Sequence, residues 1–283
     1  MPTLLDTLQK GTAYLESHGV EEARLNMQHL IAQTLECERM QLYIDFDLPM
    51  EETQLETLRD LMKRRAEGEP LQHLLGTVEF CDREFKSDSR ALIPRPETEE
   101  LVAKLLAVKT WPNPAKILDV GCGSGVIGLS LAAGIEGAEV VLTDISLDAL
   151  ELAKKNATAL DIKATFVESN LFSNVPNHPF DLIVANLPYI PNAEVPQLSR
   201  EVQHDPVLAL AGGEIGTELM FQLISESFDL LNANGRLVLE YGIGQAAALK
   251  NAAESAGFET VKVGRDFAGI ERFLFAVKTA DPA

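Results

Sequence analysis

The sequence of 283 residues is poor in cysteine, with three thiols at positions 37, 81 and 122. Their number is odd and their spacing does not suit a metal site, so we expect free thiols in the reducing cytoplasm. The five histidines also lack the spacing of metal ligands, and no Ser-His-Asp arrangement can be argued. No apolar run approaches the roughly 20 residues that cross a membrane. The sequence therefore predicts a cytoplasmic protein with neither a bound metal nor a membrane-spanning helix.

Positive charge is scarce as well, because 24 lysines and arginines stand against 43 aspartates and glutamates and give a net charge of −19. An acidic surface repels a phosphate backbone, so we expect no direct binding to nucleic acid. We interpret the basic triplet Lys63-Arg64-Arg65 as a solvated helix end. The overall charge instead favours a protein partner that carries basic segments.

Apolar residues make up 46% of the chain, which is enough for a sizeable core, and the length favours two domains. Residues 1–74 are expected to form an all-helical domain, because apolar residues such as Ala23 and Met27 recur at helix-face spacing. Residues 75–95 alternate in short strand-like pieces and predict a β-hairpin linker. Residues 96–283 then alternate between strands and helices.

This alternation predicts an α/β fold with a doubly wound, mostly parallel sheet and helices on both faces. Strands are expected at 116–120, 138–143, 162–167, 180–185, 235–240, 258–263 and 272–277. The last two are separated by a loop that is too short for a crossover helix, so they should pair antiparallel.

A glycine-rich loop follows the first strand of the expected sheet. The strand ends near Asp119, and glycines alternate at Gly121, Gly123 and Gly125 ahead of an apolar helix. Glycines let a ligand approach the backbone closely, and the helix N-terminus adds a partial positive charge. The second strand ends in Asp144, close to the ~20-residue spacing at which a carboxylate reaches a ribose hydroxyl in nucleotide-binding βαβ units.

The glycine loop supports two interpretations. Residues 123–128 spell G-x-G-x-x-G, the dinucleotide fingerprint, which would indicate a nicotinamide- or flavin-dependent oxidoreductase. Read from Asp119 instead, the acidic residue and the following G-x-G-x-G are similar to the first motif of S-adenosylmethionine-dependent methyltransferases. A carboxylate before the glycines would repel a pyrophosphate but suits a zwitterionic amino acid, so we favour the second interpretation.

A turn after the fourth strand carries the second candidate group. The apolar run at 182–185 predicts a buried strand, which ends in Asn186, Leu187, Pro188 and Tyr189. Pro188 stiffens the turn. The Asn186 side-chain oxygen and the Leu187 carbonyl can each accept one N–H hydrogen of a planar amino group, and Tyr189 can cover its plane. We interpret these four residues as the catalytic site.

Together these motifs resemble those of the peptide chain release factor glutamine methyltransferases, and the likeness extends over nearly the whole chain. It is carried by Glu67–Gly76, Leu92–Glu100, the glycine loop, the turn at 186–189 and Leu208–Gly216. The resemblance implies a seven-stranded Rossmann-like methyltransferase sheet and an N-terminal helical domain that is used with the protein substrate. The implied reaction is methyl transfer from S-adenosylmethionine to the glutamine amide in the Gly-Gly-Gln loop of release factors.

The resemblance also implies roles for single residues. The glycine loop would hold the methionine part of the cofactor, and Asp144 would take the ribose hydroxyls. Asn170 and Leu171 would flank the adenine, where the family more often has an acid and an aromatic residue. The expected cofactor-binding set is Gly121, Cys122, Gly123, Ser124, Gly125, Asp144, Asn170, Leu171 and Asn186.

One departure from the family keeps alternatives open. Leu187 stands where the family usually has proline, and Asn-Leu-Pro-Tyr also occurs in enzymes that methylate adenine amino groups of ribosomal RNA. The alternatives are methyl transfer to a ribosomal-protein glutamine or to an adenine of nucleic acid, and an NAD-dependent oxidoreductase. A helical adaptor with a degenerate methyltransferase fold is a further alternative, which the intact turn and Asp144 argue against.

Overall fold

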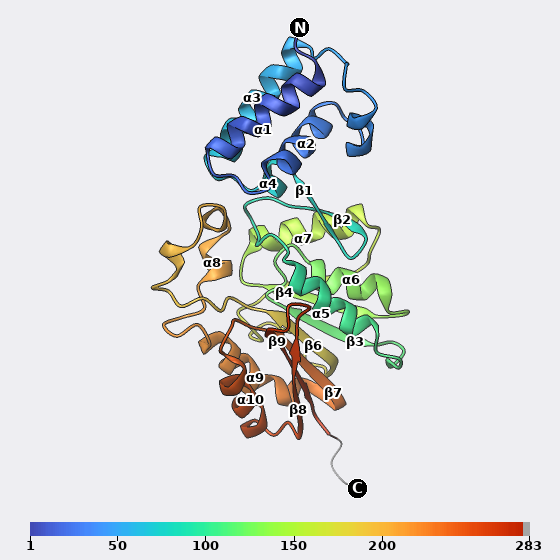
Figure 1. Ribbon diagram of the computed structural model, residues 1–283. Helices are drawn as coiled ribbons and strands as arrows, with labels where there is room; N and C mark the ends of the chain where they lie inside the picture. Colours follow the sequence, from blue (N-terminus) through green and yellow to red (C-terminus); the bar gives the residue numbers. More distant parts are fainter. Residues whose placement is uncertain (280–283) are drawn as a thin grey trace. The chain divides into compact units, whose positions relative to one another are not determined.

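The computed structural model describes residues 1–279, and the chain divides into two compact units (Figure 1). The helical unit comprises Met1–Thr77 together with Ser199–His204. The sheet unit comprises Val78–Leu198 together with the residues from Asp205 onward. Within residues 1–279, no helix combines the length and the apolar character that crossing a bilayer requires.

The helical unit is built from amphipathic helices around one apolar core. Its helices are α1 (Leu4–Ser17), α2 (Ala23–Thr34), α3 (Glu52–Ala66) and α4 (Leu71–Leu75), with the 3₁₀-helices η1 (Arg39–Tyr43) and η3 (Val202–His204). The Thr3 hydroxyl caps the start of α1, and the Asp6 side chain accepts from the Thr3 amide in return. Leu8 and Leu15 of α1 are buried with Met27 of α2 in this core. The expected all-helical fold of this region is confirmed.

The basic triplet at the end of α3 is only partly solvated. Arg65 is buried, and its guanidinium donates to Glu201 Oε2 at 2.8 Å and to Asn26 Oδ1 at 2.7 Å. The interpretation of the whole triplet as a solvated helix end is therefore wrong for Arg65. Because Glu201 belongs to Ser199–His204, this ion pair fastens that segment within the helical unit.

A hairpin leads into the sheet unit. Its strands, β1 (Thr77–Phe80) and β2 (Arg83–Lys86), form a two-stranded sheet, as the sequence predicted. Cys81 and Asp82 connect them with φ angles of 50° and 57°. Positive φ at both central residues matches the right-handed twist of two tightly joined strands.

The main sheet has seven strands within the described residues, in the order β5-β4-β3-β6-β7-β9-β8. They are β3 (Lys116–Val120), β4 (Glu139–Asp144), β5 (Thr165–Glu168), β6 (Phe180–Asn186), β7 (Leu231–Glu240), β8 (Thr260–Arg265) and β9 (Glu271–Val277). β9 is antiparallel to both of its neighbours, and the remaining pairs are parallel. The expected doubly wound sheet and its antiparallel last pair are confirmed.

Helices cover both faces of this sheet (Figure 1). They are α5 (Pro96–Leu106), α6 (Val126–Gly134), α7 (Leu147–Ala159), α9 (Glu218–Leu230) and α10 (Ala246–Ser255). The sheet unit also contains the shorter η2 (Val195–Gln197) and α8 (Val207–Leu210). Leu182 and Val184 of β6 belong to the core with α5, α6 and α7, whereas Ile183 and Ala185 belong to the core with α9 and α10. Burial on both faces explains why β6 is an uninterrupted apolar run.

One strand is longer than expected. β7 begins at Leu231 rather than at residue 235, and its register against β6 is irregular between Phe180 and Leu182. The Asp181 carboxylate accepts hydrogen bonds from the Lys116 amide at 2.8 Å and from Asn232 Nδ2 at 2.7 Å. These tertiary bonds hold a polar, turn-like stretch in the sheet, which local sequence preference alone does not reveal.

The strand order places a switch point between β3 and β6, because β4 and β5 follow on one side of β3 and β7 on the far side of β6. The carboxyl ends of four parallel strands meet at this edge, at Val120, Asp144, Asn186 and Glu240. Ligands of open α/β sheets bind outside such a point.

Candidate active site

The glycine loop turns sharply between β3 and α6. Gly121, Gly123 and Gly125 have φ angles of 69°, 53° and 84°, which other residues adopt only with strain. Gly125 is the N-cap of α6, and its amide donates to the Cys122 carbonyl at 2.8 Å. Glycine at these positions therefore lets a bare backbone reach the switch point.

Asp144 ties this loop to the end of β4. Its Oδ2 accepts from the Gly123 amide and its Oδ1 accepts from the Ser146 amide, each at 2.9 Å. Burial raises the pKa of the carboxyl, and backbone N–H groups at Ser146, Gly123 and Ile145 oppose the rise. Asp144 is thus both an organiser of the glycine loop and a polar group at the entrance to α7.

Asp119, near the end of β3, contacts the start of α6, the helix that follows the loop. Its side chain is fully buried, Oδ2 accepts from the Gly128 amide at 2.8 Å, and Oδ1 has no hydrogen-bond partner among the described residues. Burial raises its pKa to about 7, and the charge of Asp144 adds to the rise. Asp119 therefore ties the end of β3 to the first turn of α6 through the Gly128 amide.

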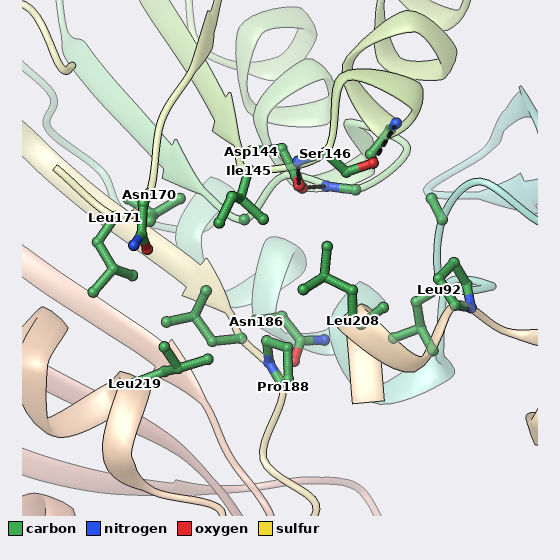
Figure 2. Close-up of a pocket in the computed structure, with 18 of the residues that line it drawn as sticks. Leu92, Asp144, Ile145, Ser146, Asn170, Leu171, Asn186, Pro188, Leu208 and Leu219 are labelled. Carbon is green, nitrogen blue, oxygen red and sulfur yellow. Dashed lines mark hydrogen bonds between the residues drawn. The ribbon is translucent and has the colours of Figure 1, made fainter. Parts of the chain in front are cut away.

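A pocket lies at the switch point (Figure 2). The expected site residues that line it are Gly121, Gly123, Asp144, Asn170, Leu171, Asn186, Leu187 and Pro188. Figure 2 shows Asn186 and Pro188 on one side of the pocket and Asp144, Ile145 and Ser146 on the other. The structure therefore brings together the glycine loop, the acid after β4 and the turn after β6.

Four of the expected site residues do not line this pocket. They are Cys122, Ser124, Gly125 and Tyr189. Cys122 is buried in the core with α5, α6 and α7, and the Ser124 carbonyl accepts from Asn156 Nδ2 at 2.9 Å. Tyr189 is half-buried against the opposite core, and its carbonyl accepts from Gln245 Nε2 at 3.0 Å. A direct role of Tyr189 over the acceptor plane stays a prediction.

Most lining residues that the sequence analysis missed are apolar. The full set of lining residues that were not expected is Arg90, Ala91, Leu92, Val120, Ile145, Ser146, Ala149, Ser169, Pro206, Leu208, Ala209 and Leu219. Apolar side chains carry no chemical signature in a sequence, and of these residues Leu92, Val120, Leu208 and Ala209 lay in stretches that had been singled out. Ile145 and Leu208 are 48% and 56% exposed, so they offer an apolar surface to a ligand.

Hydrogen bonds hold the turn after β6 to the end of α8 and to the residues that follow it. The Ile190 amide donates to the Leu210 carbonyl at 3.1 Å, and the Gly212 amide donates to the Ile190 carbonyl at 2.9 Å. A side chain at position 212 would collide with the Pro188 carbonyl. The Asn192 amide also donates to the Gly213 carbonyl at 2.8 Å, so the Gly212-Gly213 stretch supports the turn.

The Asn186 side chain enters a buried hydrogen-bond chain. Asn186 Nδ2 donates to Thr98 Oγ1 at 3.1 Å, and Thr98 Oγ1 donates to Glu240 Oε2 at 2.8 Å. Within the described part of the chain, neither Asn186 Oδ1 nor the Leu187 carbonyl accepts a hydrogen bond. The turn therefore keeps two neutral acceptors available.

Comparison with known proteins places the chain in a family. Residues 6–76 match the family model described as the PrmC N-terminal domain, and residues 98–205 match the methyltransferase small domain. The release factor glutamine methyltransferases of Geobacter sulfurreducens and Deinococcus radiodurans are 38% and 37% identical to this chain. Each alignment covers 96% of this chain, and 95% and 98% of those relatives. The chain belongs to the release factor glutamine methyltransferase family. The predicted family and enzyme class are confirmed, and the oxidoreductase alternative is wrong.

Solved structures agree with this membership at the level of the fold. A methyltransferase from Pyrococcus furiosus has a TM-score of 0.54 at 18% identity, over 69% of this chain and 89% of that one. A 16S rRNA N2 G1207 methyltransferase from T. thermophilus, in complex with AdoMet and guanosine, also has a TM-score of 0.54 at 19% identity, over 71% of this chain and 49% of that one. Both show that the chain has the methyltransferase fold.

Proposed function

We propose that this member of the family transfers a methyl group from S-adenosylmethionine to the side-chain nitrogen of the glutamine in the Gly-Gly-Gln loop of peptide chain release factors. The observation that carries the proposal is that the turn with two neutral acceptors, Asn186 Oδ1 and Leu187 O, lines the same pocket as Asp144 and the glycine loop. The names of relatives that align over nearly the whole chain support the same substrate.

The pocket fits S-adenosylmethionine better than a dinucleotide. The backbone of the glycine loop would hold the methionine part, and Asp144 would accept from the ribose hydroxyls. Asn170 and Leu171 would enclose the adenine. When bound, the cofactor supplies an activated methyl group on a sulfonium, whose positive charge suits a site beside the Asp144 carboxyl.

Catalysis would come mainly from positioning. A glutamine amide is a weak nucleophile, because its nitrogen lone pair is delocalised into the carbonyl, so its approach to the methyl must be in line. Asn186 Oδ1 and Leu187 O would accept the two N–H hydrogens and aim the nitrogen. The same oxygens would stabilise the positive charge that develops on the nitrogen as its bond to the methyl forms. The methyl–sulfur bond would break with its electron pair left on a neutral thioether sulfur, and the extra proton on nitrogen would then pass to solvent.

The remaining expectations concern the partner. We propose residues 1–74 as the substrate-recognition domain, 75–95 as its linker and 96–283 as the methyltransferase domain. The match of residues 6–76 to an N-terminal family model supports a separate helical module. The net charge of −19 favours a basic protein partner over direct contact with nucleic acid, and the free thiols suit the cytoplasm.

The proposed reaction can be tested with the purified chain, purified release factor and methyl-labelled S-adenosylmethionine. Mass spectrometry of the peptide with the Gly-Gly-Gln loop should show one added methyl group. A release factor in which that glutamine is replaced should stay unlabelled. Parallel reactions with ribosomal proteins and ribosomal RNA test the alternative acceptors. Label on those acceptors, and none on the release factor, would overturn the proposal.

A further inference from the structure

A buried carboxylate lies beside the acceptor turn and takes no part in the reaction as described so far. Glu240 ends β7, pairs in register with Asn186 at the end of β6, and is 2% exposed. Burying a carboxylate costs free energy unless hydrogen bonds and charges around it compensate. Such a group next to a reactive turn is a candidate for a functional task.

When Glu240 is ionised, the hydrogen bonds from Asn186 to Thr98 and from Thr98 to Glu240 can point in only one direction. Thr98 Oγ1 lies 2.8 Å from Glu240 Oε2, and a carboxylate can only accept, so the hydroxyl proton points to Glu240. The Thr98 oxygen then offers a lone pair to Asn186 Nδ2 at 3.1 Å. Only the NH₂ end of the Asn186 amide satisfies that contact, so Oδ1 is the end that is left for a substrate.

We propose that Glu240 and Thr98 are positioning residues that determine which end of the Asn186 amide meets the substrate. This inference rests on the function proposed above for Asn186. An asparagine amide keeps nearly the same shape when it flips by half a turn, so packing alone does not choose between the two orientations. The flipped form would set NH₂ against the N–H groups of an incoming glutamine, and methyl transfer would stop.

The negative charge on Glu240 sets the direction of these two hydrogen bonds. Burial raises the pKa of Glu240 to about 7, and the charge of Glu97 adds to the rise, whereas Thr98, Arg272 and Asn186 lower it. These groups lie on α5, β6 and β9, around the end of β7. Glu240 therefore titrates near neutral pH, where a change of charge alters the hydrogen-bond pattern.

Protonation would release the Asn186 amide. A protonated Glu240 can donate to Thr98, and the Thr98 hydroxyl can then donate to Asn186 Oδ1 and hold the flipped form. The phenol of Tyr189, whose own pKa burial and the Glu240 charge raise, stays neutral throughout this range. Turnover should accordingly fall as the pH drops through about 7.

The experiment measures kcat and KM of the full chain on release factor across about pH 5.5 to 9. Thr98→Val keeps the shape but loses the hydroxyl, so kcat should fall about 10- to 100-fold, the scale of a small misplacement at a reacting group. Its KM and its S-adenosylmethionine affinity should change little. Thr98→Ser should restore most of kcat. Glu240→Gln should give a low kcat without the acid limb of the pH profile.

Glu97→Gln is the matched control, because it removes a neighbouring negative charge and leaves the hydrogen-bond chain intact. Its acid limb should persist and move to lower pH. Normal kcat in Thr98→Val, or an unchanged acid limb in both Glu240→Gln and Glu97→Gln, would overturn the proposal. If Thr98→Val does not fold, the test rests on the acid limb of the kcat profile, which should be absent in Glu240→Gln and shifted to lower pH in Glu97→Gln. If the wild-type chain methylates no release factor, the proposed function itself is refuted.

Discussion

Gly121 and Leu187 are in such close contact that a Cβ atom at position 121 would lie 2.7 Å from Leu187 Cδ2. The loop proposed to hold the cofactor therefore meets the residue whose carbonyl is proposed to hold the substrate. Leu187 is buried, so the leucine that replaces the family's usual proline packs directly on the loop. A distortion in one half of the site should reach the other half.

Gly121→Ala should damage both stability and function. The added methyl collides with Leu187, and a φ of 69° is strained for alanine, so we expect a loss of about 2–4 kcal/mol in the free energy of unfolding. Denaturant titration measures that loss, and calorimetry with S-adenosylmethionine should show weaker binding.

Gly244→Ala is the matched control for this variant. Its φ is 85°, and nothing lies within 4 Å of the added Cβ, so it carries the backbone strain without a collision. The expected loss is about 1–2 kcal/mol. Leu187→Ala in the Gly121→Ala background should recover part of the difference. Equal losses in the two single variants would contradict the contact argument.

Asn186→Ala should lower turnover far more than cofactor affinity. Removing one preorganised group that stabilises developing charge costs about 10²–10³ in kcat. Because Asn186 lies across the pocket from Asp144, the affinity for S-adenosylmethionine should change by less than about fivefold, or 1 kcal/mol. Single-turnover kinetics and calorimetry separate the two effects. Asn192→Ala, at an exposed position just after the turn, is the control and should keep normal turnover. Retention of near-normal kcat in Asn186→Ala would remove this residue from the mechanism.

Asp144→Ala should weaken S-adenosylmethionine binding by about 1–3 kcal/mol, the usual cost of leaving buried polar groups unpaired. The variant would also strip the Gly123 and Ser146 amides of their acceptor, so the glycine loop would lose its tie to β4. Calorimetry provides the measurement. Asp148→Ala, an exposed acid in the first turn of α7, keeps the same net charge change and should bind normally. Equal affinity in the two variants would argue against a ribose contact.

Local patterns were sufficient to predict much of the fold and fewer than half of the residues that line the pocket. The apolar run of β6, the short loop before β9 and the alternating glycines each have one physical explanation in a doubly wound sheet. The edge where parallel strands end then places Asp144 and Asn186 at one switch point. These residues could be found because each one follows an apolar strand directly.

The supporting residues have no such local signal. Thr98 has an ordinary place in the first turn of α5, and Glu240 simply ends an apolar strand, so neither was linked to Asn186 before the sheet register was known. Likewise, nothing near Arg65 shows that its partner is Glu201, far along the chain. Contacts of this kind depend on tertiary packing, which sequence spacing does not encode.

The buried carboxyl of Asp119 should make stability depend on pH in a defined direction. Its pKa is raised from 3.8 to about 7 in the folded chain, so the folded state holds the proton more tightly than the unfolded state. The resulting stabilisation is complete below the unfolded pKa and is lost as the pH rises through about 7.

Asp119→Asn cannot ionise, so its stability relative to the wild type should improve by on the order of 2–4 kcal/mol between about pH 5 and 8. Denaturant unfolding at both pH values measures the change. Glu240 also titrates near neutral pH, but both proteins contain it, so its contribution drops out of the difference between them. The exposed Asp148→Asn control should show no such trend, and a difference that is constant with pH would mean that Asp119 stays ionised in its buried position.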